Sequence, residues 1–370
     1  MDGNNKEIQI WLDFSSLFDA SGIQPDMQYQ DFLQACVDKL DIVLIAEKGD
    51  MAYVRRYLKK REMNQAQIVE EGENRKSGSK IILHISKKYE KPCVLEGIYC
   101  CSLDFEESLL SLQGKSLVEL ARKKLLYTAL SHKYELIIQK DTQKECEFIR
   151  NILRKNQIQT GRILDCFCGC GRHDSCLNSY GFQIDGVDIS KEQIRHAIEN
   201  NSPQNHYYVR DIRDFEIKEK FYDASICMWT SFNYLSDEVD MRGFIAKVAM
   251  GLKHRGILIL DTKNFCAQDI YKIYTKQMED EDARIQMLII KVLCHRIQNS
   301  RYLYFIEDKK NGNRKFQIDQ EMVKIYSFQE LAKYAEPYFR VKAVYGDFDQ
   351  GQYEEKKSDR MIFVLEKRED

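Results

Sequence analysis

One stretch near the middle of the chain restricts its fold more than any other. Residues 162–173 read Arg-Ile-Leu-Asp-Cys-Phe-Cys-Gly-Cys-Gly-Arg-His, an apolar strand that ends in Asp165 and turns into a helix. Gly169 and Gly171 permit positive φ and let a ligand approach the backbone closely. The N-terminus of the following helix offers unpaired N–H groups to an anionic group. Such a strand–turn–helix is the ligand-binding turn of a doubly wound α/β sheet.

The spacing within this turn argues against two common phosphate sites. A dinucleotide fingerprint needs a small residue three positions after its second glycine, and Asp174 stands there. A P-loop ends in Gly-Lys-Ser/Thr, whereas Gly171 is followed by Arg172 and His173. The turn therefore favours neither NAD nor a nucleoside triphosphate.

A second acid follows at the end of the next predicted strand. The segment Phe182–Asp188 has the apolar pattern of a buried strand and ends in Asp188. An acid at this position is placed to accept both hydroxyls of a ribose. The glycine turn, Asp165 and Asp188 together resemble the S-adenosylmethionine site of class I methyltransferases. The resemblance implies S-adenosylmethionine as the cofactor.

The resemblance runs from about residue 132 to residue 370, and is strongest to bacterial small-molecule and sugar N-methyltransferases. In that family a leading tyrosine lies over the cofactor, and an acid and an apolar residue after the third strand hold the adenine. The positions implied to bind the cofactor are Tyr134, Asp165, Cys168, Gly169, Gly171, Asp188, Ile189, Asp211, Ile212, Met228 and Thr230. Relatives usually carry glycine where this chain has Phe167, so we expect its bulky side chain to reshape the methionine end of the site.

No catalytic base can be identified from the sequence. His173 is one candidate, although a helix N-terminus disfavours imidazolium and a capping or core role is the alternative. Asn233 and Tyr234 follow the fourth predicted strand, whose C-terminal end borders the ligand, and are candidate substrate positioners. The same loop reads Met228-Trp229-Thr230-Ser231 and lacks the Asp/Asn-Pro-Pro-aromatic motif of nucleobase and glutamine amino-methyltransferases.

The amino-acid composition limits which partners and which cellular location we expect for this protein. A net charge of −2 gives no basic footprint, so we do not expect a nucleic-acid partner. No apolar run is long enough for a signal peptide or a membrane span. The 12 cysteines are scattered, which favours reduced thiols in a cytoplasm. Cys166, Cys168, Cys170 and Cys176 could suggest a metal site, but we expect separate packing roles for these thiols and predict no metal site.

The chain is long enough for two domains. Alternating strand and helix patterns over residues 1–125 predict a smaller α/β domain with an accessory or substrate-recognition role. Its opening, residues 12–19, faintly resembles a haloacid-dehalogenase-type phosphatase, but Phe14 stands where the second acid is needed. Residues 132–370 form the methyltransferase-like domain. Three antiparallel strands over about 286–326 interrupt it and predict a lid or a homodimer surface.

These features predict a Rossmann-like α/β fold with a seven-stranded, mostly parallel sheet, an antiparallel lid insertion and a smaller N-terminal α/β domain. The predicted function is transfer of a methyl group from S-adenosylmethionine to N or O of a small molecule, in the cytoplasm. Two alternatives stay open: an RNA or protein methyltransferase, and a non-catalytic S-adenosylmethionine-binding assembly protein.

Overall fold

The computed structural model describes residues 8–13, 40–46, 51–60, 66–70, 81–85, 93–95, 98–101, 117, 122, 124–294 and 296–369. The chain divides into two compact units that are each discontinuous in sequence. One unit, here called the C-terminal unit, comprises residues 116–269, 293–299 and 321–370. The other, the N-terminal unit, comprises residues 1–115, 270–292 and 300–320.

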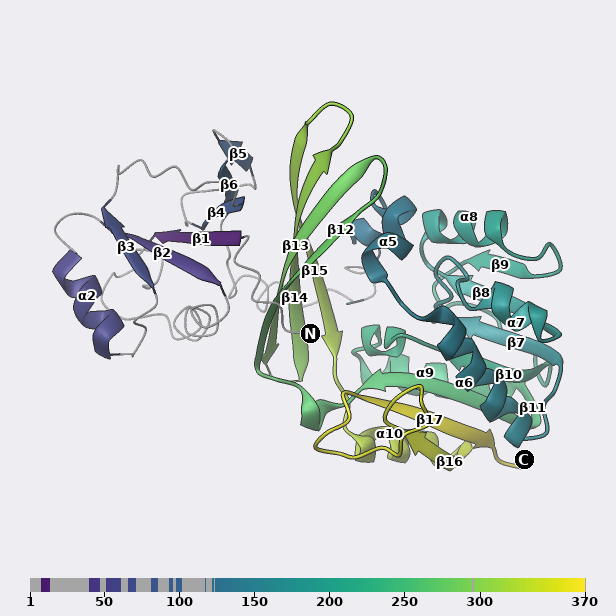
Figure 1. The fold of residues 1–370 in the computed structure, drawn as a ribbon. Helices are drawn as coiled ribbons and strands as arrows, with labels where there is room; N and C mark the ends of the chain where they lie inside the picture. Colours follow the sequence, from purple (N-terminus) through teal and green to yellow (C-terminus); the bar gives the residue numbers. More distant parts are fainter. Residues whose placement is uncertain are drawn as a thin grey trace. The chain divides into compact units, whose positions relative to one another are not determined.

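The C-terminal unit contains a seven-stranded sheet (Figure 1), in the order β16-β17-β11-β10-β7-β8-β9. Its strands are β7 (Gly161–Cys166), β8 (Phe182–Asp188), β9 (His206–Val209), β10 (Tyr222–Cys227), β11 (Leu252–Lys263), β16 (Phe339–Tyr345) and β17 (Arg360–Lys367). Strands β7 to β11 are parallel, and β17 runs antiparallel to both β11 and β16. The strand order reverses between β7 and β10, which places a ligand at their carboxyl ends. The predicted sheet is confirmed.

Helices connect and cover these strands. They are α5 (Tyr134–Ile138), α6 (Thr142–Lys155), α7 (Asp174–Ser179), α8 (Lys191–Asn200), α9 (Glu238–Gly251) and α10 (Phe328–Ala335), with short 3-10 turns η2 (Leu125–Tyr127), η3 (Ser131–Lys133), η4 (Ser231–Tyr234) and η5 (Phe265–Ala267).

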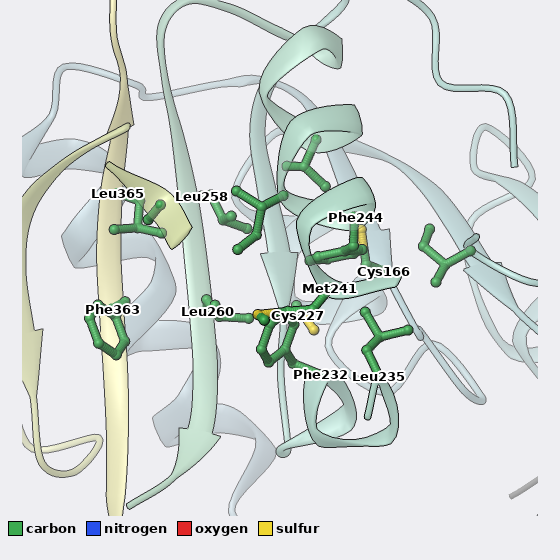
Figure 2. Packing of buried hydrophobic residues seen from close by; sticks show 14 of the residues in the cluster. Cys166, Cys227, Phe232, Leu235, Met241, Phe244, Leu258, Leu260, Phe363 and Leu365 are labelled. Carbon is green, nitrogen blue, oxygen red and sulfur yellow. The ribbon is translucent and has the colours of Figure 1, made fainter. Parts of the chain in front are cut away.

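The two faces of the sheet are packed by different helices because strand residues alternate in direction. Along β11, Leu258 and Leu260 belong to the core that contains Phe244 of α9 (Figure 2). Ile257 and Ile259 belong to the other core, with side chains of α6 and α7. The run Ile257–Leu260 is therefore apolar throughout, as expected of a central strand covered on both faces.

The N-terminal unit contains a six-stranded sheet in the order β3-β2-β1-β4-β6-β5, in which only β5 runs antiparallel to its neighbour. Its elements are β1 (Ile8–Asp13), β2 (Asp41–Ala46), α2 (Met51–Lys60), β3 (Gln67–Glu70), β4 (Ile81–Ile85), β5 (Cys93–Leu95) and β6 (Ile98–Cys101). The described strands and helix agree with the predicted α/β pattern. Phe14 and the rest of the phosphatase-like opening after Asp13 lie outside the described residues.

The insertion after β11 differs from its prediction. It forms four strands, β12 (Tyr271–Glu279), β13 (Ala283–Cys294), β14 (Ile297–Asp308) and β15 (Arg314–Lys324), in one sheet in chain order. The three strands predicted over about 286–326 correspond to β13, β14 and β15. The sequence missed β12, because it is an edge strand of mixed polar and apolar residues that carries only a weak pattern. A role for these strands as a lid stays a prediction.

Side chains of the insertion complete the core of the N-terminal unit. Leu288 of β13 and Leu303 of β14 are fully buried in the same hydrophobic cluster as Ile10 of β1 and Leu44 of β2. The inserted strands and the N-terminal strands therefore depend on one shared core. None of the helices in the described part of the chain is long and apolar enough to cross a bilayer.

We expect Leu260→Ala to lower the free energy of unfolding by about 2–5 kcal/mol, because the side chain is 1% exposed and the cavity left behind cannot collapse fully. Urea unfolding followed by circular dichroism measures the change. Ile198→Ala on α8 is the control, since Ile198 is 61% exposed and its truncation costs about 0.5 kcal/mol or less. Equal effects of the two substitutions would contradict the core assignment.

Candidate functional site

A pocket of about 860 Å³, part of it open to solvent, lies at the carboxyl ends of β7, β8, β9 and β10. Of the residues predicted from the sequence, those that line it are Tyr134, Asp165, Cys168, Gly169, His173, Asp188, Ile189, Asp211, Ile212, Met228 and Tyr234. Gly171, Thr230 and Asn233 are not among its lining residues.

Asp188 joins the two turns that form the floor of this pocket. One carboxylate oxygen accepts a hydrogen bond from the Gly169 N–H at 2.9 Å, and the other accepts from the Ser190 N–H at 2.8 Å. Burial raises the pKa of Asp188, and these backbone donors oppose the rise. Each carboxylate oxygen has a second lone-pair direction, so both can still accept a ligand hydroxyl.

Asp165 and Asp174 form an acidic pair beside the glycine turn. Burial, followed by the nearby Asp174 carboxylate, raises the pKa of Asp165 well above its usual range. Asp165 Oδ2 and Asp174 Oδ1 have no hydrogen-bond partner among the described atoms. A buried carboxylate oxygen without a donor is costly, and a ligand ammonium next to Asp165 would remove that cost.

The two glycines of the turn have different roles. A Cβ on Gly169 would meet only Gln193 Oε1 at 3.7 Å, which leaves the backbone open toward the pocket. A Cβ on Gly171 would lie 2.8 Å from Asn201 Nδ2 and from Asp174 Oδ2. Gly171 is therefore required for packing behind the turn, which explains why it does not line the pocket.

Asp211 lines the pocket but is already paired. Its carboxylate accepts hydrogen bonds from Arg213 Nε at 3.0 Å and from an Arg213 guanidinium nitrogen at 2.7 Å, and also from the Arg213 backbone N–H at 3.0 Å. Burial raises the pKa of Asp211, but the bonds from Arg213 outweigh it and lower the pKa. Asp211 thus both forms the turn after β9 and lines the pocket.

His173 lies in the pocket wall and is bound to Glu145 of α6. Its Nε2 is 2.8 Å from Glu145 Oε2, which also accepts from the Trp229 indole N–H at 2.6 Å and from Arg172. Burial lowers the pKa of His173 despite the carboxylate next to it. The neutral His173 imidazole is hydrogen-bonded to Glu145 and so holds this part of the pocket wall in position. Glu145 was missed from the sequence, because nothing in a helical pattern shows that one acid points inward.

Asn233 and Tyr234 occupy different surroundings. The Asn233 side chain is fully buried, donates to Lys324 O at 2.6 Å and accepts from the Thr262 hydroxyl at 3.0 Å. These bonds hold the loop after β10 in place. Tyr234 faces the pocket, and its hydroxyl donates to Glu321 Oε1 at 2.6 Å.

Three bulky residues near the pocket have left-handed backbone. Phe167 has a φ of 61°, and Trp229 and Thr230 have φ values of 58° and 60°. A side chain in this region costs about 1–2 kcal/mol relative to the usual conformations. Phe167 thus has the backbone conformation that glycine adopts at the lowest cost. The Phe167 ring packs against Phe244, with ring centroids 5.9 Å apart, and this packing offsets the cost of the backbone conformation.

The cysteines of the glycine turn have separate environments. Cys166 is buried next to the Ser225 hydroxyl at 3.5 Å, whereas Cys168 and Cys170 line the pocket. Among the described residues no group of three or more His, Cys, Asp or Glu side chains is arranged to hold a metal ion.

Comparison with protein families matches residues 163–256 to a model described as a methyltransferase domain. A glycine/sarcosine N-methyltransferase of Aphanothece halophytica is 35% identical over 129 residues, which cover 34% of this chain and 48% of that protein. A dTDP-3-amino-3,4,6-trideoxy-alpha-D-glucopyranose N,N-dimethyltransferase of Streptomyces venezuelae is 25% identical over 122 residues, covering 33% and 51%. The chain thus spans about half the length of these curated relatives.

Solved structures resemble a larger part of the chain. The sugar N-methyltransferase KedS8 from a Streptoalloteichus species aligns with 66% of this chain and 94% of its own, with a TM-score of 0.57 and 19% sequence identity. At this identity the likeness concerns the fold. It agrees with the seven-stranded sheet described above.

We expect Phe167→Gly to be more stable than Phe167→Ala by about 1 kcal/mol, because both lose the ring but only alanine keeps a Cβ at positive φ. Urea unfolding of the two variants measures the difference. The same pair at Phe221, where φ is not positive, should show glycine less stable by about 0.5–1 kcal/mol. If alanine is the better residue at both positions, the proposed backbone strain is absent.

Proposed function

We propose that this chain, whose residues 163–256 match a methyltransferase-domain model, transfers the methyl group of S-adenosylmethionine to a nitrogen of a small-molecule acceptor. The observation that carries the proposal is the position of Asp188. Its two oxygens are held by the backbone of both turns at the sheet's reversal point, and they face the same pocket as Gly169. Acceptance of two neighbouring ribose hydroxyls suits this geometry.

The residues around the pocket fit the rest of the cofactor. Asp165 offers a buried carboxylate oxygen that lacks a donor, which suits the ammonium of the methionine end. Ile189, Ile212 and Met228 provide an apolar wall for a base. Asp211 is engaged by Arg213, so an adenine amine would share its carboxylate with that guanidinium.

S-adenosylmethionine supplies a methyl group that its sulfonium already activates. The chain therefore needs to align the acceptor and exclude water more than it needs to activate either partner. The aromatic side chains of Tyr134, Trp229 and Tyr234 line the pocket. The hydrogen bonds from Trp229, Arg172 and His173 to Glu145 keep that wall fixed.

The acceptor class rests on the relatives, whose names describe methylation of glycine, sarcosine and amino sugars at nitrogen.

We also propose that residues 1–125 make accessory contacts or recognise the substrate, and that the methyltransferase domain begins near residue 132. A homodimer through the inserted strands is a further part, since β12 is an edge strand that a second copy can extend. We also place the protein in the cytoplasm.

Asp188→Ala should weaken binding of S-adenosylhomocysteine at least about tenfold, because a hydrogen bond to a charged group contributes about 1.5–3 kcal/mol. Isothermal titration calorimetry measures the affinity. Asp188→Asn, which keeps one acceptor oxygen, should lose less, and Asp214→Asn on the exposed segment after β9 should bind like the wild type. Unchanged binding by Asp188→Ala would remove the main support for the proposal.

Methyl transfer itself is measured with labelled S-adenosylmethionine and a panel that contains glycine, sarcosine, amino sugars, total RNA and a protein mixture. We expect label in small amines and none in the macromolecules. Label in RNA or protein would replace the small-molecule proposal by a macromolecular one. Cofactor binding without transfer to any member of the panel would favour a non-catalytic binding protein.

A further inference from the structure

A row of four polar side chains begins in the pocket and ends inside the protein. Tyr127 of η2 and Tyr234 of η4 both line the pocket, and their hydroxyl oxygens are 3.1 Å apart. The Tyr234 hydroxyl is 2.6 Å from Glu321 Oε1, and Glu321 forms an ion pair with Lys124. The side chains of Lys124 and Glu321 are only 5% and 11% exposed. We call these four residues the tyrosine row.

The direction of the hydrogen bonds in this row follows from the charge of Glu321. Burial opposes ionisation, but the Lys124 and Lys263 ammonium groups outweigh it and hold the pKa of Glu321 well below its usual range. An ionised carboxylate only accepts hydrogen bonds. Tyr234 must therefore donate its single proton to Glu321.

The direction of these hydrogen bonds also determines whether the Tyr127 hydroxyl can donate to a ligand. Because the Tyr234 proton is used toward Glu321, the bond between the two tyrosines requires Tyr127 to donate to Tyr234. The Tyr127 oxygen then has no proton left for the pocket and keeps only lone pairs. The row thus presents the pocket with a hydrogen-bond acceptor, polarised by the ionised carboxylate behind it.

Tyr127 is also held firmly enough to position a ligand. Its backbone carbonyl accepts a hydrogen bond from the Ser190 hydroxyl at 2.7 Å, and the carbonyl of Leu126 accepts from Gln193 Nε2 at 3.3 Å. The Lys124 ammonium lies 4.9 Å from the centre of the Tyr127 ring. These contacts tie η2 to the start of α8, directly after Asp188, so the tyrosine row and the predicted ribose site share one support.

We infer that the tyrosine row selects acceptors with an N–H group, and that the Tyr127 oxygen positions a primary or secondary amine for methylation. The inference rests on the proposed methyl transfer and names its acceptor class. A group without a hydrogen-bond donor, such as a carboxylate, a carbonyl or a quaternary ammonium, gains nothing from Tyr127.

The same row disfavours a hydroxyl as the nucleophile. A hydroxyl must lose its proton to attack, but Glu321 is a weak base because Lys124 stabilises its ionised form. A neutral amine attacks through its own lone pair and needs positioning rather than a base. As the new N–C bond forms, the S–CH3 bond of the sulfonium would break and its electron pair would leave with sulfur in S-adenosylhomocysteine. The nitrogen keeps its proton until then, and the proton of the resulting ammonium leaves to water.

Calorimetry on protein saturated with S-adenosylhomocysteine tests the selection with two ligand pairs, sarcosine with glycine betaine and ethanolamine with choline. The first member of each pair has N–H groups and the second has none in any protonation state. We expect the wild type to prefer the N–H member by about tenfold in at least one pair, which corresponds to one hydrogen bond. Tyr127→Phe should reduce that ratio to about one.

Glu321→Gln separates selection from a merely structural role. The glutamine amide can donate to Tyr234 and so let the row reverse, which turns Tyr127 into a donor. We expect the preference for the N–H member to disappear while a ligand without N–H binds equally well or better. Tyr234→Phe, which breaks the row without removing a charge, should have the same effect if Glu321→Gln is unstable.

Tyr180→Phe is the matched control, because the Tyr180 hydroxyl accepts from Gln143 outside the pocket. It should keep the wild-type ratio. An unchanged ratio in Tyr127→Phe, or a wild type that does not prefer N–H ligands in either pair, overturns the inference. Absence of methyl transfer to every acceptor of the panel overturns the proposed function instead, and the two failures are distinguishable because the ligand titrations require no turnover.

Discussion

The carboxylate of Asp188 is the interaction on which the site depends. It accepts the N–H of Gly169 after β7 and the N–H of Ser190 after β8, and so sets the distance between the two turns. Ser190 in turn caps α8 through Gln193 N and bonds to the Tyr127 carbonyl. One acid thus orders the glycine turn, a helix start and the aromatic wall, because each is fixed to the next by a hydrogen bond from the backbone or a short side chain.

The parts that could be predicted from the sequence are those with a local signal. Apolar runs bounded by glycines and acids gave the strands of the seven-stranded sheet, since burial on both faces leaves continuous apolar stretches such as Ile257–Leu260. Asp188 at the end of β8 and the turn at Gly169 were recognised because each directly follows or ends such an apolar run. Eleven of the predicted site residues line one pocket, although their part in binding stays a prediction.

The parts that could not be predicted depend on residues far apart in the chain. Glu145 and Tyr127 precede the glycine turn, and Glu321 follows it by more than a hundred residues, yet all three shape the pocket or its wall. No period or spacing connects such residues, because only the packed fold brings them together. The unusual Phe167 was noticed as an exception to a family pattern, but its left-handed backbone required the structure.

The shared core of the N-terminal unit also determines how the protein can be divided. Leu288 and Leu303 of the insertion are buried with Ile10 and Leu44, so removing the first 115 residues would strip an apolar face from strands that remain. An exposed apolar face of this kind promotes aggregation. The smallest fragment expected to remain monodisperse is therefore not the C-terminal two-thirds of the chain. It is a spliced polypeptide from which the first 115 residues and the outer parts of the hairpins have been excised together.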